Sequence, residues 1–596
     1  MSRLGFRAAG LGMILGSVVA LAMLGQPAAA AVPAPGGAAV PAPIDPSGRA
    51  HSLVRSAEQA THTVPNPLLK ELFADGDDDE SDDPTAVSAL CQSFLGHPSP
   101  FRALAPNVDT INGDGVAPVG SAAGCSTPQN ETTVAVNPDN PRNIVEGAND
   151  YRIFNARENR IDSSGWAYTS MDGGRTWKDV ELPKLNLQTG ATGALAFMDA
   201  AGDPAIAFGP HDTVYYSTLV FSRAEVPETE QGASGIAVSI SHNGGLSFGD
   251  PVIVHLDGVN PDGTPTPSSI FNDKEWITAD QRTGTVYVTW TQFTFDADGN
   301  FIDSPVVVSA SRDFGRTWSA PRQVSPDMST FTGGITSFGS GSNPRIGNDG
   351  TLYVAYETSV CQTAACDAPT DHDAVVMAIS HDGGRTYTNT EVALDFDFPF
   401  NDDIGNSALT GENFRINSFP QLAYDQATNR LWVTWADDSD GRYANGVSVR
   451  TNGDSFLAGS RDGVHWSAPV KIGSGSDEVF PAVAARAGRV AVSFYTRADD
   501  PHGVGLDYAF VSGSGNDVAR GPIRRITTQT SDPRVEFPAI GADSGQVLQG
   551  TFIGDYSAID IGSDLRVHPS WTDFRGSPAT TLPNQDVNTQ SIPVRH

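Results

Sequence analysis

The sequence is poor in basic residues and, beyond its N-terminus, in long apolar runs. Lysine and arginine together number 37 against 70 aspartates and glutamates, which gives a formal net charge of -33. A surface of that charge repels the phosphates of nucleic acids and the headgroups of anionic lipids, so we expect neither as a partner. No segment after the N-terminal region approaches the length of a membrane span. These shortages favour an acidic globular protein.

Cysteine is scarce, and the common metal and phosphate motifs are missing. Four cysteines fit an oxidising compartment, and the simplest pairing joins Cys91 to Cys125 and Cys361 to Cys366. No CxxC pair, HExxH string or phosphate-binding loop accompanies them, and the histidines show no ligand spacing. We therefore expect no metal site and no obligatory cofactor.

The first hundred residues predict export followed by a solvated segment. Arg3 and Arg7 precede an apolar run, and small residues at 28–30 follow it as a cleavage site. This pattern predicts a signal peptide over residues 1–30 and a secreted, extracellular protein that leaves the membrane after cleavage; an uncleaved anchor is the alternative. Residues 31–100 are Pro/Ala-rich and then strongly acidic, which predicts a disordered linker or propeptide.

One short pattern recurs through the rest of the chain. It combines Ser, Asp or Asn, Gly and a closing aromatic residue, and its copies begin 71, 70, 69 and 80 residues apart. A near-constant period with one motif per period is typical of a repeat architecture. The five copies start at Ser170, Ser241, Ser311, Ser380 and Ser460.

The pattern predicts a tight turn between two strands. Ser and Asp side chains can accept hydrogen bonds from backbone N–H groups of the turn, and Gly adopts positive φ without a steric penalty. The aromatic residue would anchor the turn between neighbouring sheets. Each unit of roughly 70 residues also contains two opening strands, so it predicts a four-stranded propeller blade.

Counting the opening strand pairs predicts an all-β fold, a β-propeller of seven four-stranded blades over residues 101–596. A six-bladed ring is the alternative if one unit is an appendage. The seventh unit lacks an outer strand, and we expect the segment 101–125 to supply it and close the ring. The units begin near Thr133, Pro204, Glu275, Pro344, Pro420, Pro481 and Asp555.

These turns resemble the Asp-boxes, also called BNR repeats, of the sialidase or neuraminidase superfamily. The resemblance covers about residue 125 to the C-terminus. It implies a propeller in which the turns hold blades together and lie away from the active face. Function is therefore expected where the first strands begin and the second strands end. The candidate arginines at these positions are Arg152, Arg345, Arg415, Arg497 and Arg575.

The resemblance also implies roles for these residues. Members of the superfamily clamp a substrate carboxylate with three arginines, use a Tyr–Glu pair as nucleophile and an Asp as acid/base in a retaining displacement. The nearest string to the family's Phe-Arg-Ile-Pro motif begins at Phe414 and has Asn417 in place of Pro. The expected clamp combines Arg345 and Arg415 with Arg575 or Arg152. The other expected groups are Tyr556 or Tyr151 as nucleophile, Glu357, Glu275 or Glu131 behind it, and Asp150 or Asp555 as acid/base.

Two functions follow as hypotheses. The first is a secreted, monomeric glycoside hydrolase of exo-alpha-sialidase type that cleaves terminal sialic acid or a related acidic sugar from glycans. The second is a propeller that binds glycan or protein without catalysis, in which the arginines form structural ion pairs with neighbouring aspartates. Three arginines converging beside a Tyr–Glu hydrogen bond would favour the enzyme, whereas a face of paired charges would favour the binder.

Overall fold

The computed structural model describes residues 106–111 and 128–594, except 159, 228–231, 297–298, 367, 397, 445–446, 501–502, 538 and 576–584. All of these belong to one compact unit. The predicted signal peptide (1–30), the predicted linker (31–100) and the proposed Cys91–Cys125 pair lie outside the described residues.

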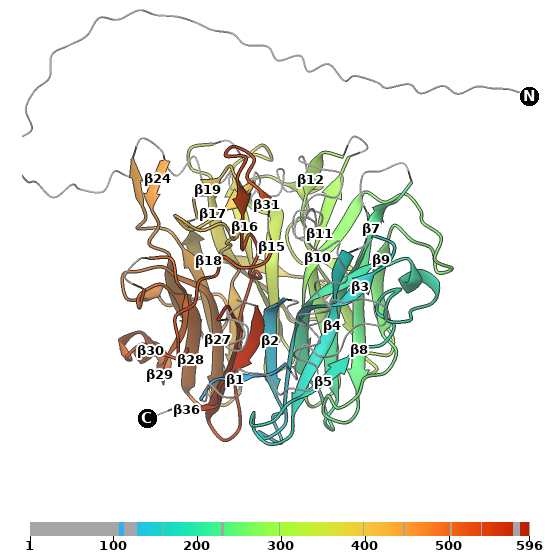
Figure 1. Cartoon of the computed structure of the whole chain (residues 1–596), viewed down its shortest axis with the longest axis horizontal. Helices are drawn as coiled ribbons and strands as arrows, with labels where there is room; N and C mark the ends of the chain where they lie inside the picture. The colour runs from blue at the N-terminus through green and yellow to red at the C-terminus, as the bar shows by residue number, and fades with distance from the viewer. Residues whose placement is uncertain are drawn as a thin grey trace, which may run out of the picture. The chain divides into compact units, whose positions relative to one another are not determined.

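The described chain is a β-propeller of seven blades (Figure 1), as the repeat spacing predicted. Blade 1 contains β2 (Gln129–Val136), β3 (Ile144–Asn155), β4 (Arg160–Ser170) and β5 (Lys178–Glu181). Blade 2 contains β6 (Ala200–Phe208), β7 (Val214–Glu225), β8 (Gly232–Ser241) and β9 (Val252–Asp257). Blade 3 contains β10 (Ile270–Ala279), β11 (Val286–Phe295), β13 (Val306–Ser311) and β14 (Arg322–Gln323), with β12 (Phe301–Asp303) beside β11. Blade 4 contains β15 (Gly334–Ile346), β16 (Leu352–Cys361), β17 (His372–Ser380) and β18 (Thr388–Asp395).

The last three blades follow the same order. Blade 5 contains β21 (Gln421–Asp425), β22 (Arg430–Asp437), β25 (Asp454–Ser460) and β26 (Val470–Ile472). Blade 6 contains β27 (Glu478–Arg486), β28 (Arg489–Thr496), β29 (Asp507–Ser514) and β30 (Arg524–Arg525). Blade 7 contains β33 (Ala558–Ile561), β34 (Arg566–Asp573), β35 (Asp586–Thr589) and β1 (Val108–Asp109), with β36 (Ile592–Pro593) beside β34. Three short 3-10 turns, η3 (Gly193–Ala196), η4 (Met328–Thr330) and η5 (Gly515–Arg520), are the helical elements within the described ranges.

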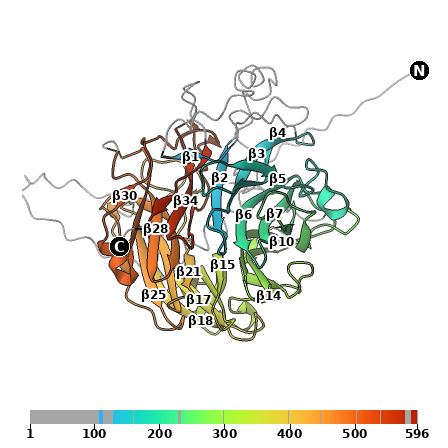
Figure 2. The same cartoon turned by 90° about the horizontal axis from the view of Figure 1, so that it is seen from below.

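The first strand of each blade lies innermost, around the axis of the ring (Figure 2). Each inner strand contacts the inner strand of the next blade, and β33 returns to β2. β1 completes blade 7 by pairing with β35, with Val108 opposite Thr589. The strand predicted from 101–125 therefore closes the ring, and the sheet edges at the junction of the chain ends are paired.

The five repeated turns have the predicted hydrogen bonds. In the third copy, Ser311 Oγ accepts from Gly315 N at 2.8 Å, and Asp313 Oδ1 accepts from Thr317 N at 2.9 Å. Trp318 closes this turn by donating from Nε1 to Gly315 O at 3.1 Å. Gly315 has φ of 80°, a left-handed conformation that favours glycine. The other copies repeat the bond from the glycine N–H to the serine oxygen.

Each repeated turn packs against the preceding blade. A Cβ on Gly315 would lie 2.9 Å from Ile240, in blade 2, and one on Gly463 would lie 2.9 Å from Ile379, in blade 4. The same relation closes the ring, because Gly174 of blade 1 lies beside His568 of blade 7. The turns therefore hold blades together, and the interblade cores, one of which joins Trp290 to Tyr215, continue between them.

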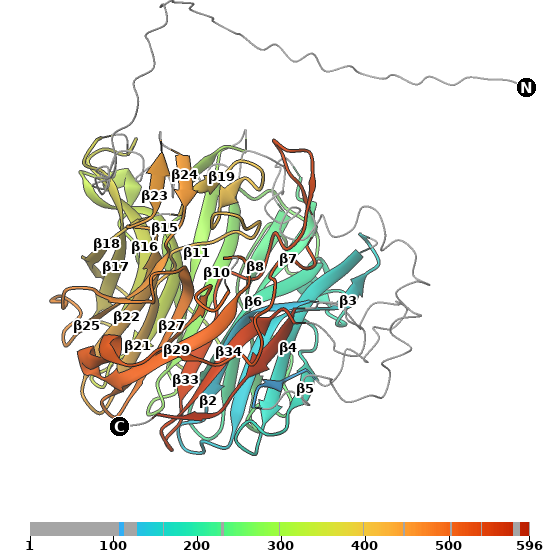
Figure 3. The ribbon, with the colours of Figure 1, turned by 60° about the vertical axis from the view of Figure 1, so that its left-hand side comes forward.

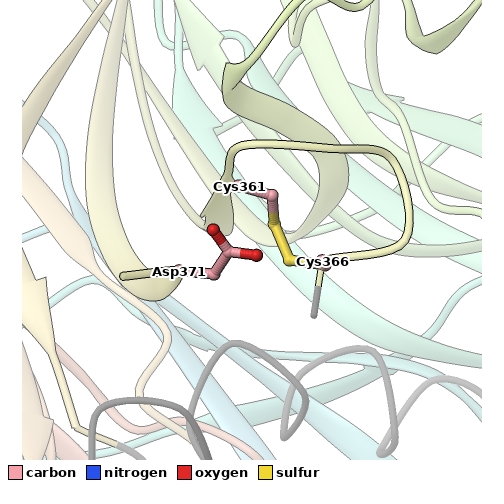
Figure 4. A group of neighbouring side chains, drawn as sticks. All are labelled: Cys361, Cys366 and Asp371. Atoms are coloured by element: carbon pink, nitrogen blue, oxygen red, sulfur yellow. A yellow bond between two sulfur atoms is a disulfide. The ribbon is translucent and has the colours of Figure 1, made fainter. Parts of the chain in front are cut away.

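The Cys361–Cys366 disulfide, predicted from the sequence, lies at the end of β16 (Figure 4). Asp371 lies beside the disulfide, and its carboxylate accepts from the backbone N–H groups of Gln362 and Ala368 at 3.0 and 2.8 Å. Because both sulfurs are in the disulfide, they offer no thiolate to a metal. This group therefore fastens the loop between β16 and β17.

Three additional hairpins lie on the face opposite the repeated turns, in the part of the chain that forms blades 4 to 7 (Figure 3). They are β19 (Phe400–Asn401) with β20 (Asn406–Ser407), β23 (Arg442–Ala444) with β24 (Val447–Arg450), and β31 (Ala539–Ile540) with β32 (Val547–Leu548). Among the described residues, no helix has the length and apolar character needed to cross a membrane.

Candidate functional site

Bulges in the inner strands aim charged side chains at the axis of the ring. The β2–β3 register shifts between Asn130 and Thr133, and matching shifts occur after Gly202 in β6 and after Asp273 in β10. At these bulges Glu131, Asp203 and Lys274 have φ of 55°, 52° and 56°. Such left-handed backbone costs a non-glycine residue about 1–3 kcal/mol and is concentrated at functional sites.

Lys274, in blade 3, connects carboxylates from three other blades. Its Nζ lies 2.8 Å from Asp203, 2.5 Å from Asp555 and 3.3 Å from Glu131. The lysine side chain is 9% exposed, and the three carboxylates are at most 5% exposed. Each repeated turn follows the third strand of its blade, and that strand runs in the same direction as the inner strand. Glu131, Asp203 and Lys274 lie in the first half of their inner strands. This group is therefore toward the end of the ring opposite the repeated turns. We call these four residues, with Arg415, the Lys274 cluster.

Arg415 joins the cluster through Asp555. Its Nε donates to Asp555 Oδ1 at 2.7 Å and its Nη2 to Asp555 Oδ2, so the pair is bidentate. The guanidinium also lies over the ring of Phe552, 4.8 Å from its centroid. Asp555 is therefore held by a lysine from blade 3 and by an arginine from the segment that precedes β21.

A second layer of polar contacts holds the cluster. Asn149, on β3, donates to Glu131 Oε2 at 2.8 Å and accepts from Asp203 N at 2.6 Å. The N–H of Asp555 donates to Glu131 Oε1 at 3.0 Å. These bonds join blades 1, 2 and 7 beneath the ammonium of Lys274, so the positions of the carboxylates are fixed by backbone and amide groups as well as by charge.

Two aromatic rings and two further carboxyls border the cluster. The Tyr556 hydroxyl donates to Pro204 O at 3.2 Å, and its ring meets Trp276 edge-on, with centroids 5.2 Å apart. Asp273 is 8% exposed and uses Oδ1 to accept from Lys274 N at 2.9 Å. Glu275 is 1% exposed, and within the described part of the chain neither of its carboxyl oxygens has a hydrogen-bond partner.

These carboxyls are driven toward different protonation states. Burial raises the pKa of Asp273 to about 6, against the pull of the Lys274 ammonium. Burial also raises the pKa of Glu131 and Glu275, and the neighbouring Asp203 carboxylate raises both further. Burial acts the same way on Asp555, but Arg415 and Lys274 outweigh it and hold the pKa of Asp555 below its ordinary value. One site therefore combines carboxyls that favour the acid form with a firmly ionised carboxylate.

Asp150 and Arg152 form an internal ion pair. Arg152 Nη2 lies 2.6 Å from Asp150 and Nη1 lies 2.9 Å from Asp179, with the guanidinium over Trp166. Tyr168 donates to Asp150 Oδ2 at 2.7 Å. Arg152 is 1% exposed, so it is fully engaged inside blade 1. The two residues predicted as acid/base and as substrate clamp thus bind each other.

Two more predicted or candidate arginines are paired in the same way. Arg575 forms a bidentate bond to Asp573 and also donates to Asn107 at 3.1 Å, beside the ring closure. Arg497 lies 2.7 Å from Glu412 and 2.8 Å from Asp477. The predicted clamp of three convergent arginines is not assembled from these residues.

Arg345 lies apart from the cluster, near the other end of its strand. The sequence placed Arg345 where the first strand of its blade begins, but β15 begins at Gly334, so Arg345 is its last residue but one. There its pKa falls to about 10 because of burial, with Asp560 as the opposing charge. Glu357 is buried on β16, one strand outward from the axis and opposite Ser340.

The structure does bring together several of the predicted alternatives. Glu131, Asp555 and Arg415 belong to the cluster, and Tyr556 and Glu275 border it. Glu131 and Glu275 are among the strongest electrostatic neighbours of Tyr556. Lys274, at its centre, was missed. Its signal was available in the sequence, because Glu131, Asp203 and Lys274 follow one another at intervals of 72 and 71 residues.

Comparison with known proteins gives distant likenesses. No family model matches the chain, and neither does any curated protein. A Hadza microbial sialidase is similar over 76% of this chain and 73% of its own, at 13% identity and a TM-score of 0.39. An ulvan lyase of a polysaccharide lyase family covers 79% and 95% at 9% identity, with a TM-score of 0.39. The NanB sialidase of Streptococcus pneumoniae covers 78% and 68% at 12% identity, with a TM-score of 0.34. At these values, activity has to be argued from the residues of this chain.

Proposed function

We propose that this chain is a carbohydrate-active propeller, a glycoside hydrolase whose acid/base chemistry takes place at the Lys274 cluster. The observation that carries the proposal is the convergence of Glu131, Asp203, Lys274 and Asp555 from four blades, three of them on left-handed backbone. Glycoside hydrolysis needs one carboxyl that donates a proton and another that stays ionised. The cluster supplies both kinds.

In this mechanism Asp273 is the proton donor. Its pKa of about 6 suits a group that protonates the leaving glycosidic oxygen as the bond to the anomeric carbon breaks. The ionised Asp203 and Asp555 stabilise the positive charge that develops on the sugar ring. Water then adds to the anomeric carbon and returns a proton to the Asp273 carboxylate. The rings of Trp276 and Tyr556 offer surfaces for the sugar.

Cleavage of a sialoside by a sialidase-type mechanism is a more specific prediction. A clamp for an acidic sugar needs free guanidinium groups, and Arg152, Arg415 and Arg575 each hold an aspartate of this chain. Tyr556 as nucleophile needs a base, for which Glu131 and Glu275 are its neighbours, although burial raises the pKa of its hydroxyl. Retaining cleavage of a sialoside therefore requires these ion pairs to open.

The test is product release from a panel of oligosaccharides and one fluorogenic sialoside. We expect the parent protein to release sugar from at least one member and Asp273→Asn to be slower by about 100-fold or more, the range of a lost general acid. Asp250→Asn is the matched control, because Asp250 is 68% exposed beside Lys184. Activity should fall as the pH rises above about 6, since Asp273 must carry its proton. Full activity in Asp273→Asn would overturn the proposal.

One observation favours the second candidate, a propeller that binds glycan without catalysis. Arg152, Arg415, Arg497 and Arg575 are all engaged in ion pairs, as that hypothesis expects. Saturable binding of a glycan with no product release from any panel member would support it over the hydrolase.

A further inference from the structure

Two arginines lie at the turn end of the ring, the end that carries the repeated turns. Arg345 is the last residue but one of β15, in blade 4, and Arg486 is the last residue of β27, in blade 6. Both side chains are half-buried, and neither guanidinium forms a salt bridge with any residue that the structure describes. They differ in this from Arg415 of the Lys274 cluster, which Asp555 holds bidentately.

The side chain of Arg486 passes the end of blade 7. Its Nη2 donates to Pro138 O, in the loop after β2 of blade 1, at 3.4 Å. Because β33 of blade 7 contacts both β27 and β2, a group that extends from blade 6 to blade 1 passes the end of β33. Asp560, the last residue but one of β33, is at the same place, since its Oδ2 accepts from Val136 N at 2.7 Å. The Arg486 guanidinium therefore lies beside Asp560.

Arg345 approaches the same carboxyl from blade 4. Burial raises the pKa of Asp560, and the charges of Arg486 and Arg345 act to lower it, so one carboxyl is within electrostatic reach of both guanidinium groups. Arg345 donates from Nη1 to Pro344 O, in its own strand, at 2.8 Å. Its remaining N–H groups have no acceptor within the described ranges.

The two arginines outnumber the carboxyl between them. Asp560 accepts from Val136 N with Oδ2 and from Ile561 N with Oδ1, each at 2.7 Å, so backbone groups and not a guanidinium engage its oxygens. The group has one unit of positive charge when Asp560 is ionised and two when it is protonated. The surplus is therefore positive in either state, in a chain whose net charge is -33.

The carboxylate at the corresponding end of blade 5, between the two arginines, is used by backbone groups. β21 ends at Asp425, whose Oδ1 accepts from Ala487 N at 3.0 Å and whose Oδ2 accepts from Gly488 N at 2.6 Å. Asp425 is 1% exposed and, within the part of the chain described, forms no salt bridge with either guanidinium. It fastens the turn after β27 and leaves the N–H groups of both arginines open to a ligand.

We infer that the turn end of the ring binds one oxoanion of the sulfate or phosphate class between Arg345 and Arg486. A guanidinium presents its N–H groups as a planar fork that matches two oxygens of such an anion. A tetrahedral anion has an oxygen pair for each fork, whereas a carboxylate has one pair in all. The anion would join blades 4 and 6 across the end of blade 5. This site is separate from the Lys274 cluster and does not depend on the proposed hydrolase.

Titration calorimetry of the whole protein with sodium sulfate, in sodium chloride that holds the ionic strength constant, tests the inference. The parent protein should bind one sulfate saturably. Arg345→Gln and Arg486→Gln should each weaken binding by about tenfold or more, which corresponds to one lost charge-assisted hydrogen bond. Arg282→Gln is the matched control, because Arg282 follows β10 at the same end of the ring but is 60% exposed beside Asp280. No saturable binding by the parent, parent-like binding in both arginine variants, or an equal loss in the control would overturn the inference.

Asp560→Asn gives a result that misfolding cannot imitate. The substitution removes the one negative charge that opposes both arginines, so it should tighten sulfate binding by about threefold or more at about pH 8, where the carboxyl is ionised. A cooperative thermal transition of the variant, measured in chloride alone, confirms that it is folded. Unchanged or weaker binding by the folded variant would contradict the site. Galactose 6-sulfate, titrated beside free sulfate, shows by its tighter or weaker binding whether the anion is carried on a sugar or is the free ion.

Discussion

Replacing Lys274 by methionine tests whether the buried charges at the axis depend on one ammonium. The substitution keeps an unbranched apolar stem and removes the contacts to Asp203 at 2.8 Å, Asp555 at 2.5 Å and Glu131 at 3.3 Å. Removing one partner of a buried ion pair typically costs about 3–5 kcal/mol, because the remaining charge stays desolvated. We expect a loss of that size in the free energy of unfolding at pH 7.

The loss should depend on pH in a defined direction. Lys274 acts to lower the pKa of Asp203 and of Asp555 in the folded protein, so it contributes stability above the unfolded carboxyl pKa of about 3.9. That contribution disappears as the pH falls and the carboxylates are protonated. The difference between the parent protein and Lys274→Met should therefore be largest near neutral pH and shrink below about pH 4.

The assay is urea unfolding followed by tryptophan fluorescence at pH 7, 5 and about 3. Lys184→Met is the control, because Lys184 pairs with Asp250 at a similar 2.8 Å but the two side chains are 46% and 68% exposed. An exposed pair contributes at most about 1 kcal/mol. Equal losses in the two variants, or a loss in Lys274→Met that does not change with pH, would refute the reasoning.

Three other changes probe the ring itself. Ser311→Ala removes the acceptor of the Gly315 N–H and should destabilise the protein by about 1–2 kcal/mol in urea unfolding, with no change in the circular dichroism of the fold. Asn107→Ala removes bonds to Ile526 O and Thr528 N at the ring closure, so we expect a loss of about 2–3 kcal/mol and faster proteolysis of the N-terminal segment; a parent-like cleavage rate would contradict this. Arg152→Met leaves Asp150 buried and unpaired and should lower stability by about 3–5 kcal/mol, with glycan binding by the remaining folded protein unchanged.

The fold was predictable because its signals are local. Each repeated turn carries its own hydrogen-bond acceptors and its own glycines, so the pattern that begins at Ser311 specifies the bonds that the structure contains. The disulfide between Cys361 and Cys366 also joins near neighbours in the chain. The inner strand of blade 4 was harder to predict. Its first residues are rich in Gly and Ser and lack apolar alternation, so the strand was expected to begin at Pro344 rather than at Gly334.

Because of that error, Arg345 was predicted to lie at the site, whereas it lies near the other end of its strand. Gly341 explains why a strand there has so little hydrophobic signal. It is at a bulge with φ of 63°, and a Cβ at this position would lie 2.4 Å from the Phe419 ring. A residue that must be small for packing against the next blade cannot also carry the apolar pattern of a strand. Blade-to-blade packing, which the sequence does not display locally, decided the position of Arg345.

Some of the buried ion pairs could be predicted from the sequence, and others could not. Asp150 and Arg152 are two residues apart on a strand, so their side chains lie on one face and their ion pair follows from strand geometry. Arg415 and Asp555 are 140 residues apart and meet only because the ring closes. The same holds for Lys274, which meets partners from three other blades. Glu131, Asp203 and Lys274 occupy the same position in the inner strands of blades 1, 2 and 3, and all three have left-handed backbone. The backbone at this position is therefore the same in the three blades, while the charge of the side chain differs.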